Sequence, residues 1–417
     1  MCQADWDRLQ YYSRKVKFFD ATGMFDNDLP QVHPLTYFRI AQLQSSALFP
    51  SLRHLRYNLG ETSNPHIFLF LSPLLDSIEL IDISGFEDTV VWSFFATLSP
   101  QMLSRIVLRT GEMSADSLKR SISHFKQLRS LELVDAVFMS DFAVLEVLGT
   151  LPSLEKFTLT AIDPHPVHAP EKSSGQSEGP SYFVALESLC VTGSFFLIQH
   201  VLGFIDSPWL KSIEIYPVVD HVRINREPDD LFTPSTTIVA SKWAQSLKNL
   251  VIGSWSSAMA HRNAILKCLT DLHEMERFIL MDWELENIDD DVRQLVMSWP
   301  KLRTLGLPLD QKCISMSTLR IIAENCPKLR RLQVRLDISV IPPFDTTGRS
   351  LHHKLEVLTL GRSFTRKKLE SQIKVTQHLD LIFPYLEAIE VQPNDKTWSG
   401  IRDLLYLCQN ASRRRVE

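Results

Sequence analysis

The sequence predicts an α/β fold in which short parallel strands alternate with helices in a curved stack. An apolar motif of the form L-x-x-L-x-L recurs along nearly the whole chain, with copies about 28 residues apart on average. Proline stands at one fixed position before many copies, and the segments between copies have helical periodicity. A motif repeating every roughly 20–29 residues is typical of a leucine-rich-repeat solenoid, here with about 13 irregular units.

Each copy of the motif predicts one strand. We call the first apolar residue of each copy the marker residue. The markers are Leu52, Leu75, Leu103, Leu128, Leu154, Leu186, Leu210, Leu247, Met275, Leu302, Leu329, Leu355 and Leu386. The apolar residues three and five positions after a marker are two apart, so they point to the same face of a strand. We therefore expect a curved parallel sheet on the concave side of the solenoid and helices on its convex side.

Proline favours the predicted boundaries. It stands two residues before seven of the markers, at Pro50, Pro73, Pro152, Pro208, Pro300, Pro327 and Pro384. Proline cannot continue a helix, so it ends the preceding one and fixes the path into the strand. Polar helix starts precede apolar turns at residues 140–141, 289–291 and 315–317. Each unit is therefore predicted to be a strand, a turn and a helix that buries its apolar side only against neighbouring units.

The turns depart from the regular leucine-rich repeat. An asparagine or cysteine usually stands eight residues after the marker, but other residues replace it in most units. These are Gly60, Ile83, Gly111, Ala136, Ile162 and Trp283, and only Asn394 fits the pattern. The side chain at this position normally bonds to the backbone of the turn. We therefore expect irregular turns and uneven curvature.

The repeat pattern divides the chain into three parts. Residues 1–48 are predicted to be an N-terminal capping helix, with apolar residues at helical spacing between Asp5 and Phe19, and a segment leading into the array. Residues 49–394 form the array, with insertions near residues 161–182, 217–240 and 338–352. Residues 395–417 are predicted to be a C-terminal cap helix, over Ile401–Cys408, and a basic tail. Such caps cover the apolar ends of the stack.

Composition excludes several classes of protein. The net charge of −5 does not favour a nucleic-acid partner or an anionic membrane, because both attract concentrated positive charge. The first 20 residues lack the apolar core of a signal peptide. The most apolar stretches, residues 67–75 and 195–205, are too short to span a membrane. The six scattered cysteines have no CxxC pair, which favours reduced thiols and a cytoplasmic or nuclear location.

No residues predict catalysis, a cofactor or a metal site, so we expect a protein that is not an enzyme. The sequence contains no phosphate-binding glycine loop, nucleophile elbow or HExxH motif. His165 and His168 lie between prolines without a third ligand nearby. The acidic segment that includes Glu284, Glu286 and residues 289–291 is better explained as a solvated helix start than as a calcium loop. Cys326 lies within a repeat, which favours a buried structural thiol.

The candidate binding surface is the concave face of the predicted sheet. Residues two and four positions after each marker, and sometimes six, should point there. The predicted partner-binding residues are Arg105, Arg109, Glu132, Lys156, Glu214, Tyr216, Arg277, Met281, Arg331, Arg335 and Glu390. Arginine and tyrosine are common interface anchors, because they combine contact area with directional hydrogen bonds. The mixture of charge signs favours a protein target over a polyanion.

Three segments resemble a known family. Ala323–Leu332 (AENCPKLRRL) and Trp299–Leu305 (WPKLRTL) resemble the cysteine-type repeats of F-box/leucine-rich-repeat proteins. Asp5–Lys17 is similar to the helix that follows the F-box in fungal members of that family, especially those of basidiomycetes. The resemblance implies the substrate-recognition part of an SCF (cullin-RING) ubiquitin ligase. No F-box is recognised within the chain, so a Skp-type adaptor and a cullin are expected partners only if an F-box exists upstream.

Two alternatives remain open. The first is a stand-alone interaction scaffold, or a decoy, that binds targets without a ubiquitin-ligase link. The second is a GTPase-activating repeat protein, which would need a catalytic arginine or asparagine arrangement that the sequence does not reveal. Association with the adaptor separates the ligase reading from the scaffold, and a GTPase-stimulation assay tests the last.

Overall fold

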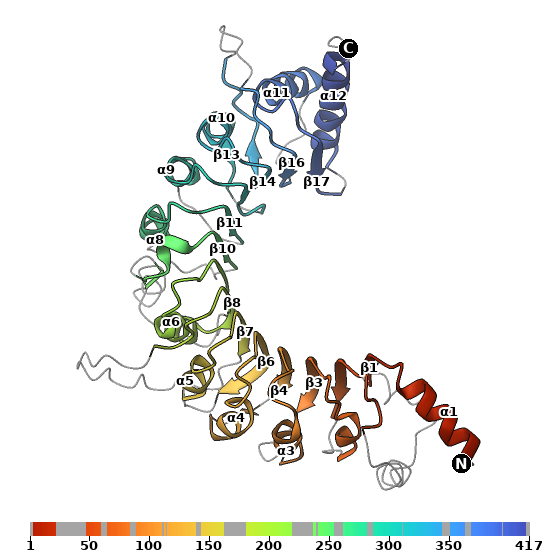
Figure 1. The fold of residues 1–417 in the computed structure, drawn as a ribbon. Helices are drawn as coiled ribbons and strands as arrows, with labels where there is room; N and C mark the ends of the chain where they lie inside the picture. The colour runs from red at the N-terminus through yellow and green to blue at the C-terminus, as the bar shows by residue number, and fades with distance from the viewer. Residues whose placement is uncertain are drawn as a thin grey trace, which may run out of the picture. The chain divides into compact units, whose positions relative to one another are not determined.

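The computed structural model describes residues 3–21, 47–59, 65–83, 89–110, 112–113, 115–138, 143–161, 181–218, 237–238, 241–253, 262–281, 287–310, 312–343, 351–362, 368–393 and 395–413. The chain forms two compact units, Met1–Leu210 and Lys211–Glu417, called here the N-terminal and C-terminal units. Strands and helices alternate in both (Figure 1). The fold is the α/β leucine-rich-repeat solenoid that the sequence predicts.

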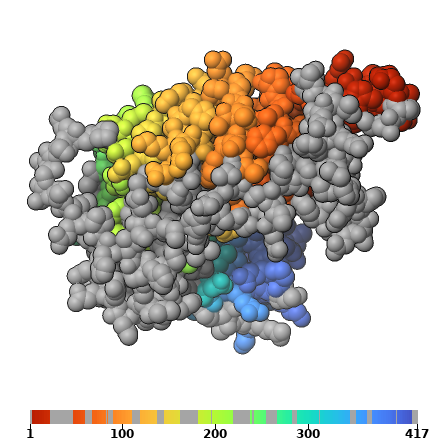
Figure 2. Space-filling view, turned by 90° about the horizontal axis from the view of Figure 1, so that it is seen from below, coloured from red at the N-terminus to blue at the C-terminus, as the bar shows by residue number. Residues whose placement is uncertain are grey.

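In the N-terminal unit the strands pair in parallel in the order β1-β2-β3-β4-β6-β7-β8, and the short β5 pairs with β6. Their bounds are β1 Phe18–Asp20, β2 His54–Asn58, β3 Ser77–Ile83, β4 Arg105–Thr110, β5 Glu112–Met113, β6 Ser130–Phe138, β7 Lys156–Ala161 and β8 Ser188–Gly193. In the space-filling view the described repeats of this unit follow one another as adjacent bands from orange to yellow-green (Figure 2).

In the C-terminal unit the parallel order is β9-β10-β11-β12-β14-β16-β17, and β13 pairs with β15 in a separate two-stranded sheet. The bounds are β9 Ser212–Pro217, β10 Asn249–Ile252, β11 Arg277–Leu280, β12 Thr304–Gly306, β13 Ile314–Ser315, β14 Arg331–Val334, β15 Leu336–Asp337, β16 Val357–Leu360 and β17 Ala388–Val391.

The helices lie mostly on one side of the strands within each unit, whereas α1 lies beyond β1 at the end of the strands (Figure 1). In the N-terminal unit they are α1 Gln3–Ser13, the 3-10 helix η1 Pro65–Phe70, α3 Thr89–Thr97, α4 Ala115–Ile122, α5 Ala143–Gly149 and α6 Phe195–Phe204. In the C-terminal unit they are the 3-10 helix η4 Ala244–Ser246, α8 Arg262–Leu269, α9 Ile288–Ser298, α10 Met316–Asn325, α11 Leu369–Ile382 and α12 Lys396–Arg413.

The predicted register is confirmed by burial. Every marker residue is at most 3% exposed, and the residues three positions later are all buried as well. The residues five positions after the markers are also buried, except Val391 in the last strand, which is half-buried. Each strand therefore contributes a row of apolar side chains to the space between sheet and helices, which is the main source of stability in such an array.

A tight turn leads into most strands. The backbone N–H of the marker donates to the carbonyl three residues earlier, as in Leu302 to Trp299 (3.1 Å) and Leu386 to Phe383 (3.2 Å). In these two turns the carbonyl residue is a fully buried aromatic, and proline follows it. Proline suits the second position of such a turn because its φ angle is fixed near the required value. The aromatic residue before it is a core position that the repeat motif does not reveal.

Within each unit a backbone ladder joins successive repeats at the start of their strands. The carbonyl of the residue after a marker accepts two N–H groups from the next repeat. Arg53 accepts from Asp76 (2.8 Å) and Ser77 (3.0 Å), and Lys248 likewise from Glu276 (2.7 Å) and Arg277 (2.9 Å). We call this the strand-start ladder. Because it uses only backbone groups, it satisfies them whatever side chains stand there.

The irregular turns have a structural counterpart. Ile83 and Ala136, which replace the usual asparagine, are both buried in the core. The pairing register shifts between Leu80 and Ile83, and again between Leu133 and Ala136. Asp135, beside the second shift, has a positive φ of 55°. A buried apolar side chain therefore occupies the position where an asparagine side chain would bond to the backbone. The strand pairing is irregular at these positions.

The predicted N-terminal helix is wrong at its C-terminal end. Helix α1 ends at Ser13, and Phe19 lies in strand β1 opposite Leu55 of β2. The carbonyl of Lys17 accepts the N–H groups of Arg53 (2.9 Å) and His54 (3.1 Å), so the strand-start ladder begins before the first marker. This backbone pairing holds the chain extended at Phe19, although the spacing of the apolar residues also fits a helix.

The C-terminal helix α12 contains the predicted cap segment, Ile401–Cys408, and extends it in both directions. Trp398 and Ile401 are fully buried. The hydroxyl of Tyr406 lies 3.4 Å from both the carbonyl oxygen of Glu387 and the backbone nitrogen of Ile389. It accepts from Ile389 and donates to Glu387 at the start of the last strand. The helix therefore contacts both the core and the backbone of β17.

Two of the predicted helix starts are confirmed. Residues 289–291 occupy the first turn of α9, and Ser315 caps α10 by accepting from the N–H of Thr318 at 3.2 Å. The start at residues 140–141 and most of the three insertions lie outside the described residues. The domain boundaries stay a prediction. None of the described helices is both long and apolar enough to cross a membrane.

Candidate functional site

The strands of both units present one face away from the helices. Burial alternates along most of them, as in β9, where Ile213 and Ile215 are buried and Glu214 and Tyr216 are not. We call the surface formed by residues two, four and six positions after the markers the open sheet face. All eleven residues that the sequence predicts for partner binding lie at these positions, and none of them is buried.

In the N-terminal unit the open sheet face carries a chain of ion pairs across four strands. Arg56 on β2 lies 3.5 Å from Asp20 on β1 and 3.4 Å from Glu79 on β3. Glu79 is also 3.3 Å from Arg109 on β4. Each of the two central groups has an opposite charge on both sides. The predicted residue Arg109 is therefore one end of a self-neutralising row, which argues against a free anion site there.

A second pair on this face is Arg105 with Glu132 on β6, at 3.7 Å. Between the two pairs lies Val107, which points to the open face yet is only 2% exposed. In register its neighbours are Glu79 on one side and Glu132 on the other. The aliphatic parts of such charged side chains cover apolar surface while their ends stay in water. The paired charged side chains therefore cover Val107, which forms a small apolar spot on the open sheet face.

The C-terminal unit repeats this device in another form. Arg277 on β11 lies 3.5 Å from Glu214 on β9, so the ion pair crosses over β10, which runs between those strands. The hydroxyl of Tyr216 donates to Glu214 at 3.1 Å. Beneath this bridge Val251 of β10 is only 1% exposed, although it points to the open face. Three of the predicted residues, Glu214, Tyr216 and Arg277, are thus brought together.

The other predicted residues are spread along the face. Arg335 donates from Nε to the carbonyl of Arg362 at 3.1 Å, and Glu390 accepts from the Thr359 hydroxyl at 2.7 Å. Met281 is 38% exposed directly after β11. Lys156 and Arg331 are exposed, and neither side chain forms a hydrogen bond or ion pair within the described parts of the chain. The predicted residues are therefore distributed over the open sheet face of each unit and do not form a single compact cluster.

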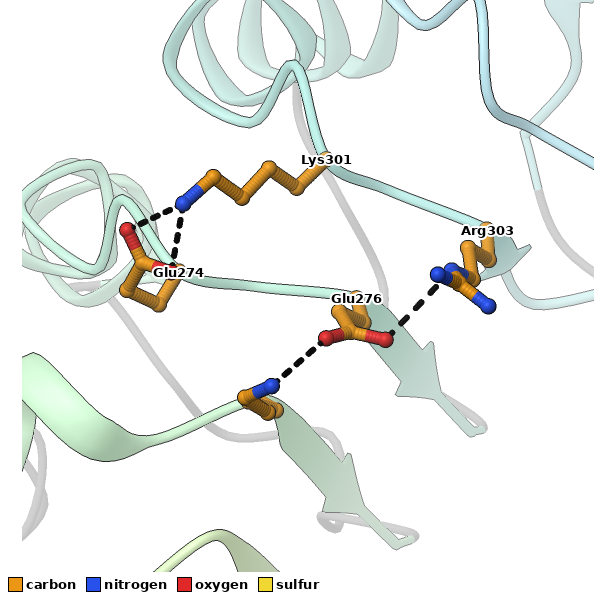
Figure 3. Close-up of polar contacts among 5 residues, drawn as sticks. Glu274, Glu276, Lys301 and Arg303 are labelled. Atoms are coloured by element: carbon orange, nitrogen blue, oxygen red, sulfur yellow. Dashed lines mark hydrogen bonds and ion pairs between the residues drawn. The ribbon is translucent and has the colours of Figure 1, made fainter.

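A further group of charges lies at the start of the strands in the C-terminal unit. Lys301 binds Glu274 through both carboxylate oxygens, at 2.5 and 2.6 Å. Glu276 lies 2.9 Å from Lys248 and 3.4 Å from Arg303. Figure 3 shows the Glu276 carboxylate facing Arg303 and the Glu274 carboxylate facing Lys301. The hydrogen bond from Lys248 lowers the pKa of Glu276, and the charges of Lys248, Arg303 and Lys328 lower it further. These carboxylates therefore remain ionised and paired.

Sequence reasoning missed five residues that shape the open face. Asp20, Arg56 and Glu79 extend the ion-pair row, and Val107 and Val251 are the covered apolar spots. Arg56 and Glu79 stand four residues after their markers, so the rule used for the predicted set already includes them. Nothing in the sequence reveals that Val107 and Val251 are covered, because this depends on which charged side chains cross the strands.

The described residues do not assemble a reactive centre of a recognised kind. No group of three or more histidine, cysteine or acidic side chains in the described ranges is placed to hold a metal ion. His165, His168, Glu284 and Glu286 lie outside those ranges. Burial raises the pKa of Cys326 to about 12, and its thiol lies 3.7 Å from the carbonyls of Val296 and Trp299. This cysteine is a buried structural thiol, as predicted.

No protein-family model matches the sequence, and no curated protein matches it. Solved structures similar to it include a leucine-rich-repeat protein of Leptospira interrogans, with 12% identity, 92% of this chain and 98% of that chain covered, and a TM-score of 0.34. Rad7 in its yeast complex with Elc1 is 15% identical, with coverages of 86% and 89% and a TM-score of 0.35.

A third similar structure is TLR13 in a complex with ssRNA13, at 13% identity and a TM-score of 0.35. The match covers 83% of this chain and 50% of that one. Similarities at these levels carry no inference about what the chain binds.

Proposed function

We propose that this chain is a non-catalytic, protein-binding scaffold whose target contacts the open sheet face. The observation that carries the proposal is the composition of that face. Tyr216 lies on β9, Arg277 lies on β11 two strands along, and Met281 directly follows β11. None of the three is buried. Such residues are enriched in the centres of protein interfaces. The paired charges beside them suit a partner of mixed charge and disfavour a polyanion.

At the finer level, we propose that the chain is the substrate-recognition part of an SCF ubiquitin ligase, located in the cytoplasm or nucleus. The support is the resemblance of Ala323–Leu332 and Trp299–Leu305 to F-box/leucine-rich-repeat proteins. The Skp-type adaptor and cullin belong to this proposal only where an F-box precedes the repeats. The stand-alone scaffold or decoy is the competing proposal, because the open face binds a target equally well without the ligase.

Site-specific photo-crosslinking tests the binding face. A photoreactive amino acid replaces Met281 on the open sheet face in one variant and Met297 in helix α9 in the other. Both methionines are exposed, at 38% and 65%, so both probes reach solvent. The proposal predicts a discrete crosslinked protein from position 281 and none from position 297. Equal crosslinking from both positions, or none from either, contradicts it.

Co-purification with the Skp-type adaptor then separates the two finer proposals. The chain, expressed with whatever coding sequence precedes Met1, is purified from cells and probed for the adaptor and cullin. An SCF receptor co-purifies with both. A target crosslinked from position 281 without adaptor or cullin supports the scaffold and removes the ligase proposal.

A further inference from the structure

The strand-start ladder of the C-terminal unit carries a concentration of positive charge on three successive repeats. The motif reads P-K-L-R at Pro300–Arg303 and again at Pro327–Arg330, and H-K-L-E at His353–Glu356. The lysine before each marker and the arginine after the first two recur at the same position in the fold. We call this set the basic edge, formed by Lys301, Arg303, Lys328, Arg330, Arg331 and Lys354.

These six side chains are all exposed. Since the three repeats pair strand to strand through β12, β14 and β16, equivalent residues lie about 5 Å apart along the edge. The lysines, each directly before a marker, therefore form one row across the three repeats. Arg303 and Arg330, each directly after a marker, form a second row beside it. Close spacing of like charges in this way is unfavourable in isolation and is compensated either within the protein or by a partner.

Internal compensation is incomplete. Lys301 pairs with Glu274, Arg303 with Glu276, and Arg330 with Glu356. Glu276 is shared, because it also binds Lys248. In the described part of the chain, the side chains of Lys328, Arg331 and Lys354 form no hydrogen bond or ion pair. Half of the basic edge is therefore unpaired, next to carboxylates that are already fully engaged.

The field of the basic edge, from its paired as well as its unpaired cations, extends beyond single repeats. Lys328 contributes to the lowered pKa of Glu276, although a whole repeat with its own marker, Leu302, separates them in sequence. The charge of Arg330 likewise disfavours protonation of the buried His353. Both effects have the sign expected of a positive surface, on a chain whose net charge is −5. The basic edge is thus a local feature that composition conceals.

We propose that the basic edge binds an acidic, glutamate- and aspartate-rich segment of a protein partner. This inference rests on the proposed protein-binding function and adds the chemistry of the partner and a second contact surface, at the edge of the sheet. Arg303, Arg330 and Arg331 present planar guanidinium groups that match carboxylates in a two-point geometry. The lysines add charge that strengthens and accelerates the encounter.

A peptide fits the edge better than a nucleic acid. The basic edge covers three repeats, so at about 5 Å per strand it is only about 10 Å from the first lysine to the last. Glu274, Glu276 and Glu356 lie along the same edge and repel a continuous phosphate backbone. Specific nucleic-acid binding generally uses many phosphate contacts over a larger surface. Carboxylates spaced by neutral residues avoid the three glutamates and reach the unpaired cations.

The test uses a fluorescein-labelled ten-residue peptide of alternating glutamate and glycine, titrated with the full chain and followed by fluorescence polarisation. The informative variant is Lys328→Glu with Lys354→Glu, which reverses two unpaired charges and removes no ion pair. The matched control is Lys119→Glu with Lys267→Glu, two exposed lysines on helices α4 and α8. Both double variants change the net charge of the chain by the same amount.

We expect the wild-type chain to bind the peptide with an affinity that falls as salt rises, because a surface charge contact is screened. The edge variant should lose at least about tenfold in affinity, and the control less than about twofold. Circular dichroism of each variant checks that the fold is intact. No binding by the wild-type chain, or equal losses in the two variants, overturns the proposal.

A labelled single-stranded oligonucleotide of ten thymidines is titrated in the same way as the peptide. Tighter binding of the oligonucleotide than of the peptide, with the same loss in the edge variant, overturns the proposal in favour of a polyanion site. The crosslinking result from Met281 does not depend on the peptide or oligonucleotide titrations. A protein crosslinked at position 281 together with no peptide binding removes the basic edge alone and leaves the proposed scaffold function standing.

Discussion

The strand starts of the two units have the same kind of backbone ladder but carry different side chains. In the N-terminal unit the residue before each marker is uncharged, as in Leu74 and Met102, which are 39% and 44% exposed. In the C-terminal unit four such residues are charged, namely Glu274, Lys301, Lys328 and Lys354. Since the strand-start ladder uses only backbone carbonyl and N–H groups, it leaves these side chains free to differ. Stability and surface chemistry are therefore encoded at different positions of the same repeat.

The largest change in the free energy of unfolding should come from a charged residue placed in the core. Leu332 is 1% exposed, and replacing it with aspartate places an uncompensated charge between sheet and helices of the C-terminal unit. We expect a loss of at least about 3 kcal/mol in the free energy of unfolding. Urea denaturation followed by tryptophan fluorescence measures it. Arg331→Asp, one residue away on the open face, is the control, and an unchanged midpoint for Leu332→Asp contradicts the register.

Leu131→Asp makes the equivalent change in the N-terminal unit, where Leu131 is also 1% exposed. A loss of the same order is expected, since both leucines stand three residues after a marker. A cost confined to one of the two variants would show that the units do not depend on this position in the same way.

A pH effect should distinguish the units next. His353 in the C-terminal unit is 5% exposed, with Nε2 2.8 Å from the carbonyl of Cys326. Burial lowers the pKa of His353, and the charge of Arg330 acts in the same direction. The unfolded chain then binds the proton more readily, so stability contributed by neutral His353 falls as pH drops below about 6.5.

Urea midpoints at pH 7.5 and pH 5.5 measure this dependence. We expect His353→Gln to reduce the difference between the two midpoints relative to the wild-type chain. Burial also lowers the pKa of His378, so a remaining slope is expected. In the N-terminal unit His54 is exposed, and His124 and His200 are only half-buried. An undiminished slope in the variant contradicts the assignment.

The helix caps should contribute equally in the two units. Ser194 accepts from the N–H of Leu197 at the start of α6, and Ser315 accepts from Thr318 at the start of α10, both at 3.2 Å. Alanine at either position should cost about 1 kcal/mol, because one helix N–H loses its partner. Thermal denaturation of the two single variants measures the costs. A cost at only one position would show that the other cap is replaced by water or neighbouring groups.

The smallest effects should come from the charges at the strand starts. Glu276→Gln removes the carboxylate between Lys248 and Arg303, and Glu155→Gln removes the partner of Arg129, 3.3 Å away in the N-terminal unit. Both pairs are partly exposed, so each substitution should cost less than about 1 kcal/mol. Urea midpoints at low and high salt measure this. A larger cost would show that side chains, and not only backbone, hold the ladder together.

The repeat register was predictable from sequence, because burial of a motif at fixed spacing depends on local periodicity. Leu332 and the other markers fall where the pattern places them. Phe19 was not predictable, since its strand forms only when Lys17 receives N–H groups from residues more than 30 positions later. Its apolar spacing fits a helix equally well, and pairing decides between the two.

The residues of the open sheet face were predictable from sequence, but their ion pairs and their exposure were not. Arg277 and Glu214 point where the marker rule places them, yet their ion pair across β10 covers Val251. The rule states which way a side chain points, whereas coverage depends on reach across two strands. The lysines of the basic edge are visible in the sequence as repeated P-K-L-R. Their meaning appears only when the sheet places the repeats side by side.

The contact of Tyr406 with the last strand has a consequence for assembly. An unpaired edge of a parallel sheet presents N–H and C=O groups that template the addition of another chain. At β17 the hydroxyl of Tyr406 occupies the carbonyl of Glu387 and the N–H of Ile389 at the strand's beginning. A second molecule that adds a strand there must first displace α12. These two backbone groups are therefore not free to pair with a strand of a second molecule.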